Sequence, residues 1–106
     1  MFMGDKVEES YERFERYRAL TYRFFRAYGA LNILMLLELL GPASLLSEVA
    51  RYTKGGAGLR LLEELGLVKR FKADRTEVVM LTDKGSKVAR LLIQVCDAIL
   101  EGDRNE

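Results

Sequence analysis

One segment, residues 44–81, constrains the fold of this chain more than any other, because it combines two patterns in a fixed order. Its first half predicts two short helices separated by a glycine-rich turn at residues 53–58. Its second half has two runs of β-branched and aromatic residues, 67–72 and 76–81, on either side of a short polar connection. Such a pair of runs is typical of a β-hairpin. The segment therefore predicts helix, turn, helix and hairpin in that order.

The second helix of this segment is the most clearly marked element. Leucines recur in it at helical spacing, at Leu59, Leu62 and Leu65. Gly66 follows where a left-handed residue would end the helix. Arg60 is the basic residue within the helix, and Glu63 and Glu64 follow it. Only the N-terminal half of the helix is therefore expected to attract a polyanion.

Two sequence runs then carry a family resemblance. LLEELGLVKRF, followed by VVMLTDKGSKVARLL, resembles the core of winged helix-turn-helix regulators of the MarR, ArsR and PadR type. In those families L-x-x-L-G-L-V closes the recognition helix and opens the wing, and L-T-x-K-G closes the wing and begins the last helix. The resemblance covers residues 31–99 and implies a winged helix that binds double-stranded DNA. The chain departs from these families in having few residues between Ala50 and Gly66, so a short recognition helix is expected.

The start of the segment carries smaller expectations. Gly41 and Pro42 are expected to end the preceding helix, because a glycine cap followed by proline stops a helix. Ala43 is expected to form the short first strand that often precedes the helix pair. Ser44 or Ser47 is expected to cap the first helix of the pair.

A long amphipathic helix is predicted before this core, over residues 6–28. It has neither proline nor glycine, and aromatic residues recur on one face every three or four positions. Gly29 is expected to end it, and residues 30–40 then form a helix that is apolar nearly all round and should be the central core helix. The aromatic stripe is expected to be buried. Burial against a second subunit is the preferred interpretation, over packing within the chain. Stacking on single-stranded nucleic acid is the functional alternative.

The last predicted helix, residues 83–101, carries an apolar seam with spacings of four, three and four, as in helices that pair with a partner helix. Thr82 or Asp83 is expected to cap it, and Cys96 is expected to be a small buried residue beside the seam. The alternative for Cys96 is that it cross-links a dimer near a two-fold axis. The predicted homodimer interface combines this seam with the aromatic stripe. Its residues are Tyr11, Phe14, Phe25, Val88, Leu92, Val95 and Ile99.

Charge is distributed unevenly along the chain, although the net charge is only +1. Residues 1–12 hold one lysine and four acids, residues 51–90 hold ten basic and five acidic side chains, and residues 91–106 hold one arginine and four acids. The predicted turn, second helix and wing are therefore the basic part. The predicted DNA contacts are Arg51, Tyr52, Thr53, Lys54, Gly55 and Gly56 with the DNA backbone, Arg60 with a base edge, and Lys69, Arg70, Lys72 and Arg75 in the wing.

The composition argues against several function classes. The chain has no histidine and a single cysteine, so no nucleophile–base pair or metal-ligand spacing can be recognised, and neither an enzyme nor a cofactor is predicted. No signal peptide or membrane segment is recognised, which predicts a cytoplasmic protein without a membrane partner. The abundance of Arg and Glu beside few amides is typical of thermophilic proteins. The sequence does not identify a small-molecule effector.

These observations together predict a mainly α fold with a small β-hairpin wing (α+β), a winged helix-turn-helix with long N- and C-terminal helices. Residues 1–106 would form one domain, with an interface helix at 6–28, the core and wing at 30–82 and a dimerisation helix at 83–101. The predicted function is double-stranded DNA binding by a homodimeric transcriptional regulator. Two alternatives stay open: a winged-helix module for protein assembly, and an architectural protein that binds DNA without a preferred operator.

Overall fold

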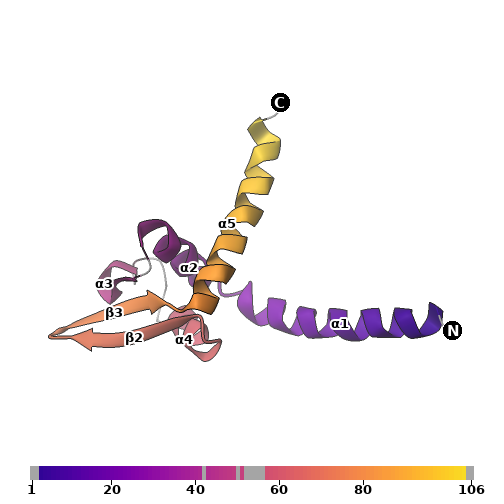
Figure 1. The fold of residues 1–106 in the computed structure, drawn as a ribbon, viewed down its shortest axis with the longest axis horizontal. Coiled ribbons are helices and arrows are strands. Elements are labelled where there is room, and N and C mark those ends of the chain that lie inside the picture. Colours follow the sequence, from indigo (N-terminus) through magenta and orange to yellow (C-terminus); the bar gives the residue numbers. More distant parts are fainter. Residues whose placement is uncertain (1–2, 42, 50, 52–56, 105–106) are drawn as a thin grey trace.

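The computed structural model describes residues 3–41, 43–49, 51 and 57–104. Within them, helices and a small sheet form a head from which two long helices project in different directions (Figure 1). The elements in chain order are α1 (Met3–Phe24), α2 (Tyr28–Leu40), β1 (Ala43–Leu45), α3 (Leu46–Val49), α4 (Ala57–Glu64), β2 (Val68–Ala73), β3 (Thr76–Leu81) and α5 (Asp83–Arg104). This is the order of helices and strands that the sequence predicts.

The core of the head is built around α2, because this helix contacts the four other helices and the strands β1 and β3. Ile33, Leu34 and Leu37 are fully buried in it, each contributing roughly 1.5–3 kcal/mol of burial free energy. The core is completed from the neighbouring elements by Phe24, Val49, Leu59, Leu62, Leu67, Val68, Val79, Leu81 and Ala89. The prediction of a central apolar helix is confirmed, although Leu39 and Leu40 at its end are exposed.

The sheet has three antiparallel strands in the order β1-β3-β2. Ala73 pairs with Thr76, which leaves a two-residue turn at the tip of the β2–β3 hairpin. Asp74 has a φ of 59° there, a left-handed conformation that aspartate tolerates better than most residues. The hydroxyl of Thr76 donates to the carbonyl oxygen of Ala73 at 2.8 Å and closes the turn. The predicted hairpin and the predicted strand at Ala43 are both confirmed.

The end of α4 has the geometry of a Schellman cap. Gly66 has a φ of 75°, and its N–H donates to the carbonyl oxygen of Glu63 at 3.0 Å. The N–H of Leu67 donates to the carbonyl oxygen of Leu62 at 2.9 Å. The predicted left-handed glycine at the end of this helix is confirmed.

The start of α5 is bonded directly to this cap. The Thr82 hydroxyl donates to the carbonyl oxygen of Gly66 at 2.7 Å and accepts from the N–H of Gly85 at 3.0 Å. The Lys84 ammonium donates to the carbonyl oxygen of Leu65 at 3.1 Å. Thr82, rather than Asp83, is therefore the N-cap of α5. The L-x-x-L-G-L-V motif at the end of α4 and the L-T-x-K-G motif at the start of α5 are therefore in direct contact.

Two expectations about helix ends are wrong. Gly29 lies inside α2, and the break falls at residues 25–27, where Ala27 has a non-helical φ of −94° and ψ of 64°. A glycine costs little in the first turn, where the N–H groups have no helical partners. Ser44 lies in β1 and Ser47 inside α3, so neither serine occupies the cap position. The pairing of β1 with β3 continues to Leu45 and delays the helix.

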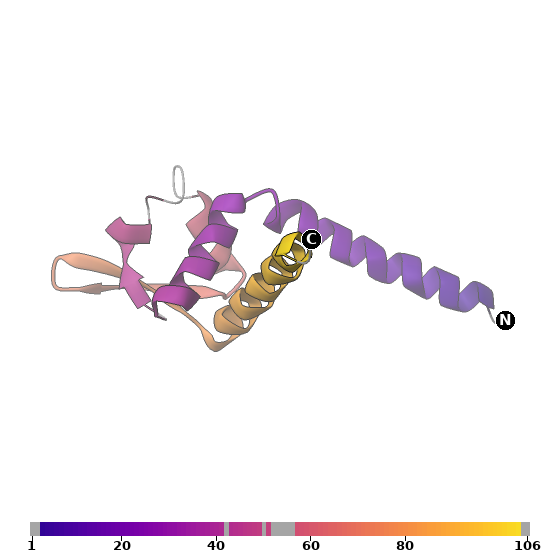
Figure 2. The same ribbon diagram turned by 90° about the horizontal axis from the view of Figure 1, so that it is seen from above.

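The outline of the chain is elongated. Figure 2 shows α1 running away from the head, and the chain extends over 62 × 39 × 24 Å. The radius of gyration is 17.0 Å, whereas a compact chain of this length would have about 13 Å. None of the described helices combines the length and apolar character needed to cross a membrane.

Candidate nucleic-acid interface

The helix predicted to read DNA, α4, has only eight residues and is held by a few apolar side chains. Leu59 and Leu62 are buried against the core, whereas Arg60 and Glu64 are exposed. Arg60 and Glu64 are four residues apart and therefore lie on the same face, one turn from each other. The predicted shortness of this helix is confirmed, and Arg60 is available at its surface.

The β2–β3 hairpin, called the wing below, carries most of its basic side chains on the surface. In β2 only Val68 is buried, so Lys69 and Lys72 are exposed. Arg75 is exposed in the turn at the tip. Figure 1 shows the wing projecting to the opposite side from α1, with α4 beside its base. The cations of the wing and of α4 therefore belong to two neighbouring elements.

Both carboxylates near the end of α4 have arginine partners from other elements. Arg70 of β2 places Nη2 3.0 Å from Oε1 of Glu63. Arg23 of α1 places Nη2 3.2 Å from Oε2 of Glu64 and donates a hydrogen bond to it. The repulsion of DNA that the sequence predicts for this half of α4 is thus offset by two guanidinium groups. Arg70, a predicted wing contact, is already held by Glu63.

Most of the other residues of the helix-turn-helix that are predicted to contact DNA lie outside the described residues. Arg51 is exposed just after α3. Tyr52, Thr53, Lys54, Gly55 and Gly56 lie outside the described residues. Apart from Arg70, the exposed cations of α4 and the wing are Arg60, Lys69, Lys72 and Arg75. Lys69 and Lys72 lie on opposite faces of β2, because successive side chains of a strand alternate.

The residues predicted for the dimer interface divide into two groups. Val88 and Leu92 are partly buried against the core of their own chain. Tyr11, Phe14, Phe25, Val95 and Ile99 are at least half exposed. Of the α1 residues whose side chains are described, only Phe24 is buried, so packing within the chain does not cover the aromatic stripe. The expectation that Cys96 is buried is wrong, because this side of α5 is only partly covered by α2 and leaves the residue exposed in the single chain.

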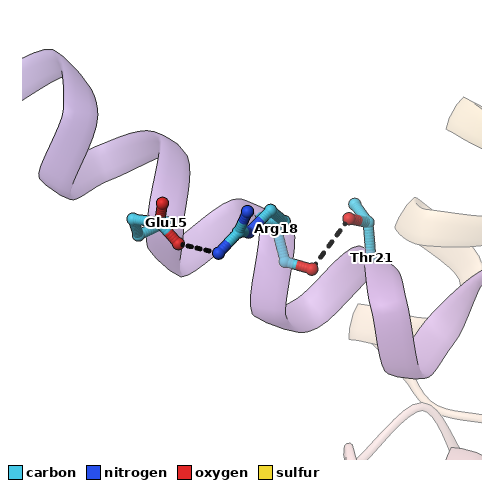
Figure 3. Close-up of polar contacts among 3 residues, drawn as sticks. All are labelled: Glu15, Arg18 and Thr21. Carbon is cyan, nitrogen blue, oxygen red and sulfur yellow. Dashed lines mark hydrogen bonds and ion pairs between the residues drawn. The ribbon is translucent and has the colours of Figure 1, made fainter.

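The polar side chains of α1 bond mainly within the helix. Figure 3 shows Arg18 paired with Glu15 at 2.8 Å and the Thr21 hydroxyl donating to the carbonyl oxygen of Arg18 at 3.1 Å. Arg13 donates to the hydroxyl of Tyr17 at 2.8 Å. Such pairs stabilise an isolated helix by a few tenths of a kcal/mol each, roughly 0.2–0.5. They support α1 where it has no neighbour and leave its apolar side chains unpaired.

The acidic side chains and the cysteine of the described residues are dispersed over the fold. No group of three or more Cys, Asp or Glu side chains is arranged there to hold a metal ion. The Cys96 thiol lies 3.8 Å from the Met35 sulfur. Neither residue is near Arg60, the predicted base contact, in the sequence. The two hollows on the surface of α1 are lined by residues of that helix alone.

Sequence reasoning missed the two ion pairs of α4. Arg23 and Glu64 are separated by 41 residues, so no local spacing relates them. The only sequence signal is that Arg23 precedes an aromatic residue, Phe24, that turned out to be the anchor of α1 in the core. A contact between the predicted interface helix and the predicted reading helix was therefore not expected.

Comparison with known proteins supports the fold. No protein-family model and no curated protein matches the chain. Among solved structures, it is similar to a transcriptional regulator homologue from Pyrococcus horikoshii, at 26% identity over 83% of this chain and 95% of that chain, with a TM-score of 0.62. A MarR family transcriptional regulator from Silicibacter pomeroyi matches at 20% identity over 92% and 74% of the two chains, with a TM-score of 0.57.

A third solved structure, reduced AbfR bound to DNA, matches at 19% identity over 96% of this chain and 85% of that chain, with a TM-score of 0.53. The three proteins differ in sequence but share the order and packing of helices and strands described above. The chain has the mainly α winged-helix fold of MarR-like transcriptional regulators, as the sequence predicts.

Proposed function

We propose that this chain is a double-stranded DNA-binding transcriptional regulator that acts as a homodimer. The observation that carries the proposal is that exposed cations lie on α4 and on the neighbouring wing of a winged-helix head. Arg60 is exposed on α4, and Lys69, Lys72 and Arg75 are exposed on the wing beside it. The likeness to two transcriptional regulators and to a protein bound to DNA supports the same function.

The two elements would contact different parts of the duplex. A recognition helix enters the major groove by its N-terminal end, which would bring Arg60 to a base edge. The wing would lie along the backbone, with Lys69 and Lys72 near phosphates and Arg75 reaching the minor groove. The predicted contacts of Lys54, Gly55 and the neighbouring residues would add backbone bonds at the start of α4.

Surface area supports the dimer. The single chain exposes 8064 Å², whereas a compact folded chain of this size would expose about 6,000 Å². The excess of about 2,000 Å² per chain is more than the roughly 800 Å² that each partner of a standard protein interface buries. Much of it comes from apolar side chains on α1 and on the second half of α5, including Tyr11, Phe14, Val95 and Ile99. Two copies joined by these helices would present two α4 helices to two half-sites.

The test is a DNA-binding titration of Arg60→Ala and Arg75→Ala at two salt concentrations. We expect each change to weaken binding to a selected duplex, by about 1–3 kcal/mol for Arg60 if it contacts a base edge. Each lost phosphate contact should also lower the slope of log affinity against log salt by about one unit. Fluorescence anisotropy with a labelled duplex measures both quantities.

Lys6→Ala is the matched control, since it removes one positive charge from the end of α1 that points away from the wing (Figure 1). It should leave affinity and salt slope unchanged. Weak, salt-insensitive binding by the unmodified protein would contradict the proposal and favour a protein-assembly module. Salt-dependent binding without any preferred sequence would contradict the regulator and favour an architectural DNA binder.

A further inference from the structure

The two carboxylates near the C-terminal end of α4 form ion pairs with two arginines, one earlier and one later in the sequence than α4. Glu63 is held by Arg70, which comes after it in β2, at 3.0 Å. Glu64 is held by Arg23, which comes 41 residues before it at the end of α1, at 3.2 Å. Two elements with different roles in the fold thus supply one cation each to the same short helix.

These pairs reverse the charge of the α4 surface. The helix itself carries Arg60, Glu63 and Glu64, a net charge of −1. With Arg23 and Arg70 included, the same surface has a net charge of +1. The two arginines therefore reduce the repulsion that Glu63 and Glu64 would exert on a polyanion approaching α4.

The Arg23 pair has a second consequence because of where Glu64 lies. Glu64 is four residues after Arg60 on the exposed face, the spacing at which two opposite charges on a helix attract each other. No ion pair of Arg60 occurs among the described residues. If Arg23 were absent, the Glu64 carboxylate would be available to Arg60 and would compete with DNA for it.

The position of Arg23 is fixed by its neighbour. Phe24 is only 7% exposed and belongs to the core, so the last turn of α1 is anchored to the head. The guanidinium of Arg23 starts from that anchored turn, whereas the arginines earlier in α1 project from a helix that has left the head (Figure 1).

We propose that Arg23 is a positioning residue for DNA binding: by holding Glu64, it keeps this carboxylate away from Arg60 and from the phosphates. This inference rests on the proposed function, because it assumes that Arg60 meets DNA. The last turn of α1 would then contribute to DNA binding separately from any contribution of α1 to a dimer interface. Arg23 itself does not need to touch the duplex.

The experiment is a set of four variants measured by anisotropy titration at low salt, with thermal unfolding to verify that each one is folded. Arg23→Ala should weaken binding by roughly two- to fivefold, since it releases one charge beside the contact surface. Glu64→Gln should bind as tightly as the unmodified protein or more tightly. The double variant Arg23→Ala, Glu64→Gln should match Glu64→Gln, and Arg23→Lys should retain most of the affinity.

Arg26→Ala is the matched control, because Arg26 lies one turn later and bonds to Tyr22 near the end of α1 rather than to α4. It should bind like the unmodified protein. If Arg23→Ala weakens binding and Glu64→Gln does not restore it, Arg23 acts by direct contact or by orienting α1, and the inference is overturned.

Arg60→Ala separates the two proposals. If Arg60→Ala weakens binding while Arg23→Ala has no effect, the inference about Arg23 fails and the proposed function stands. If Arg60→Ala has no effect on affinity, the proposed DNA surface itself fails, and the inference fails with it.

Discussion

At Gly85 the start of α5 approaches the end of α4 so closely that a side chain has no room. A Cβ built on Gly85 would overlap the carbonyl oxygen of Leu67, which is backbone and cannot rotate away. The same carbonyl accepts the N–H of Thr82 at 3.0 Å, so it is fixed on a second side. The glycine of the L-T-x-K-G motif is therefore required by a close backbone contact, not by its φ angle.

We expect Gly85→Ala to lower the free energy of unfolding by about 2–3 kcal/mol, because the backbone must shift to relieve the overlap. Urea denaturation followed by circular dichroism measures this change. Lys87→Ala, an exposed change on the same helix, is the control and should alter stability by less than about 0.5 kcal/mol. A cost for Gly85→Ala as small as that of the control would mean that α5 does not begin against Leu67.

Among the elements, α5 divides into two halves with different surroundings. Its first half packs on α2, and the Ser86 hydroxyl donates to the Glu38 carboxylate at 2.7 Å across that contact. Its second half extends beyond the head (Figure 1), and Ile99 there is 68% exposed. One continuous apolar seam therefore serves the core of the chain in one half and is free in the other.

Substitutions in the two halves should separate folding from association. Leu92→Ala should destabilise the folded chain by about 2 kcal/mol, the low end for a core leucine, because Leu92 is only partly buried. Ile99→Ala should change the stability of a single chain by less than about 0.5 kcal/mol but weaken the dimer. Urea denaturation at two protein concentrations distinguishes these effects, since only association makes the midpoint depend on concentration. Equal, concentration-independent losses in both variants would contradict the division.

What the sequence predicts well is local. Gly66 and Thr82 are recognised because helix caps depend on a residue's own backbone and hydroxyl, and the hairpin is recognised because its two strands are adjacent in the chain. Local patterns place the break after α1 at Gly29, whereas it lies at residues 25–27, directly after the buried Phe24, whose burial is a tertiary contact.

Contacts between segments that are far apart in the sequence cannot be predicted from local patterns for the same reason. Nothing in the spacing of Arg23 and Glu64 indicates that α1 ends beside α4. Cys96 was expected in the core because the seam of α5 continues past it, but periodicity does not say where a partner surface stops. The candidate site was predictable as a basic region, whereas the neutralisation of Glu63 by Arg70 required the three-dimensional arrangement.

For the whole molecule, the decisive property is that α1 lies outside the compact part of the chain. Figures 1 and 2 agree that it leaves the head on the side away from the wing. Its apolar side chains, among them Val7, Tyr11, Phe14 and Leu20, are each about half exposed or more. Large exposed apolar surfaces of this kind mark interaction sites in soluble proteins.

Tyr11→Glu combined with Phe14→Glu should convert the proposed dimer to a monomer, because burying two carboxylates in an apolar interface is strongly unfavourable. Light scattering coupled to gel filtration measures the mass, and the thermal unfolding of the head should change little. Arg16→Glu, exposed elsewhere on the same helix, is the control and should leave the mass of a dimer unchanged. A double variant that keeps the dimer mass would exclude α1 as the interface.

The three-residue break between α1 and α2 has a geometrical consequence. A helix of 22 residues is about 33 Å long, so a rotation of about 10° at residues 25–27 displaces its far end by about 6 Å. In a dimer joined through α1, the same rotation in each copy would change the distance between the two heads by several ångströms. The half-site spacing that such a dimer binds would then depend less on the heads themselves than on the angle between the head and α1 in each copy.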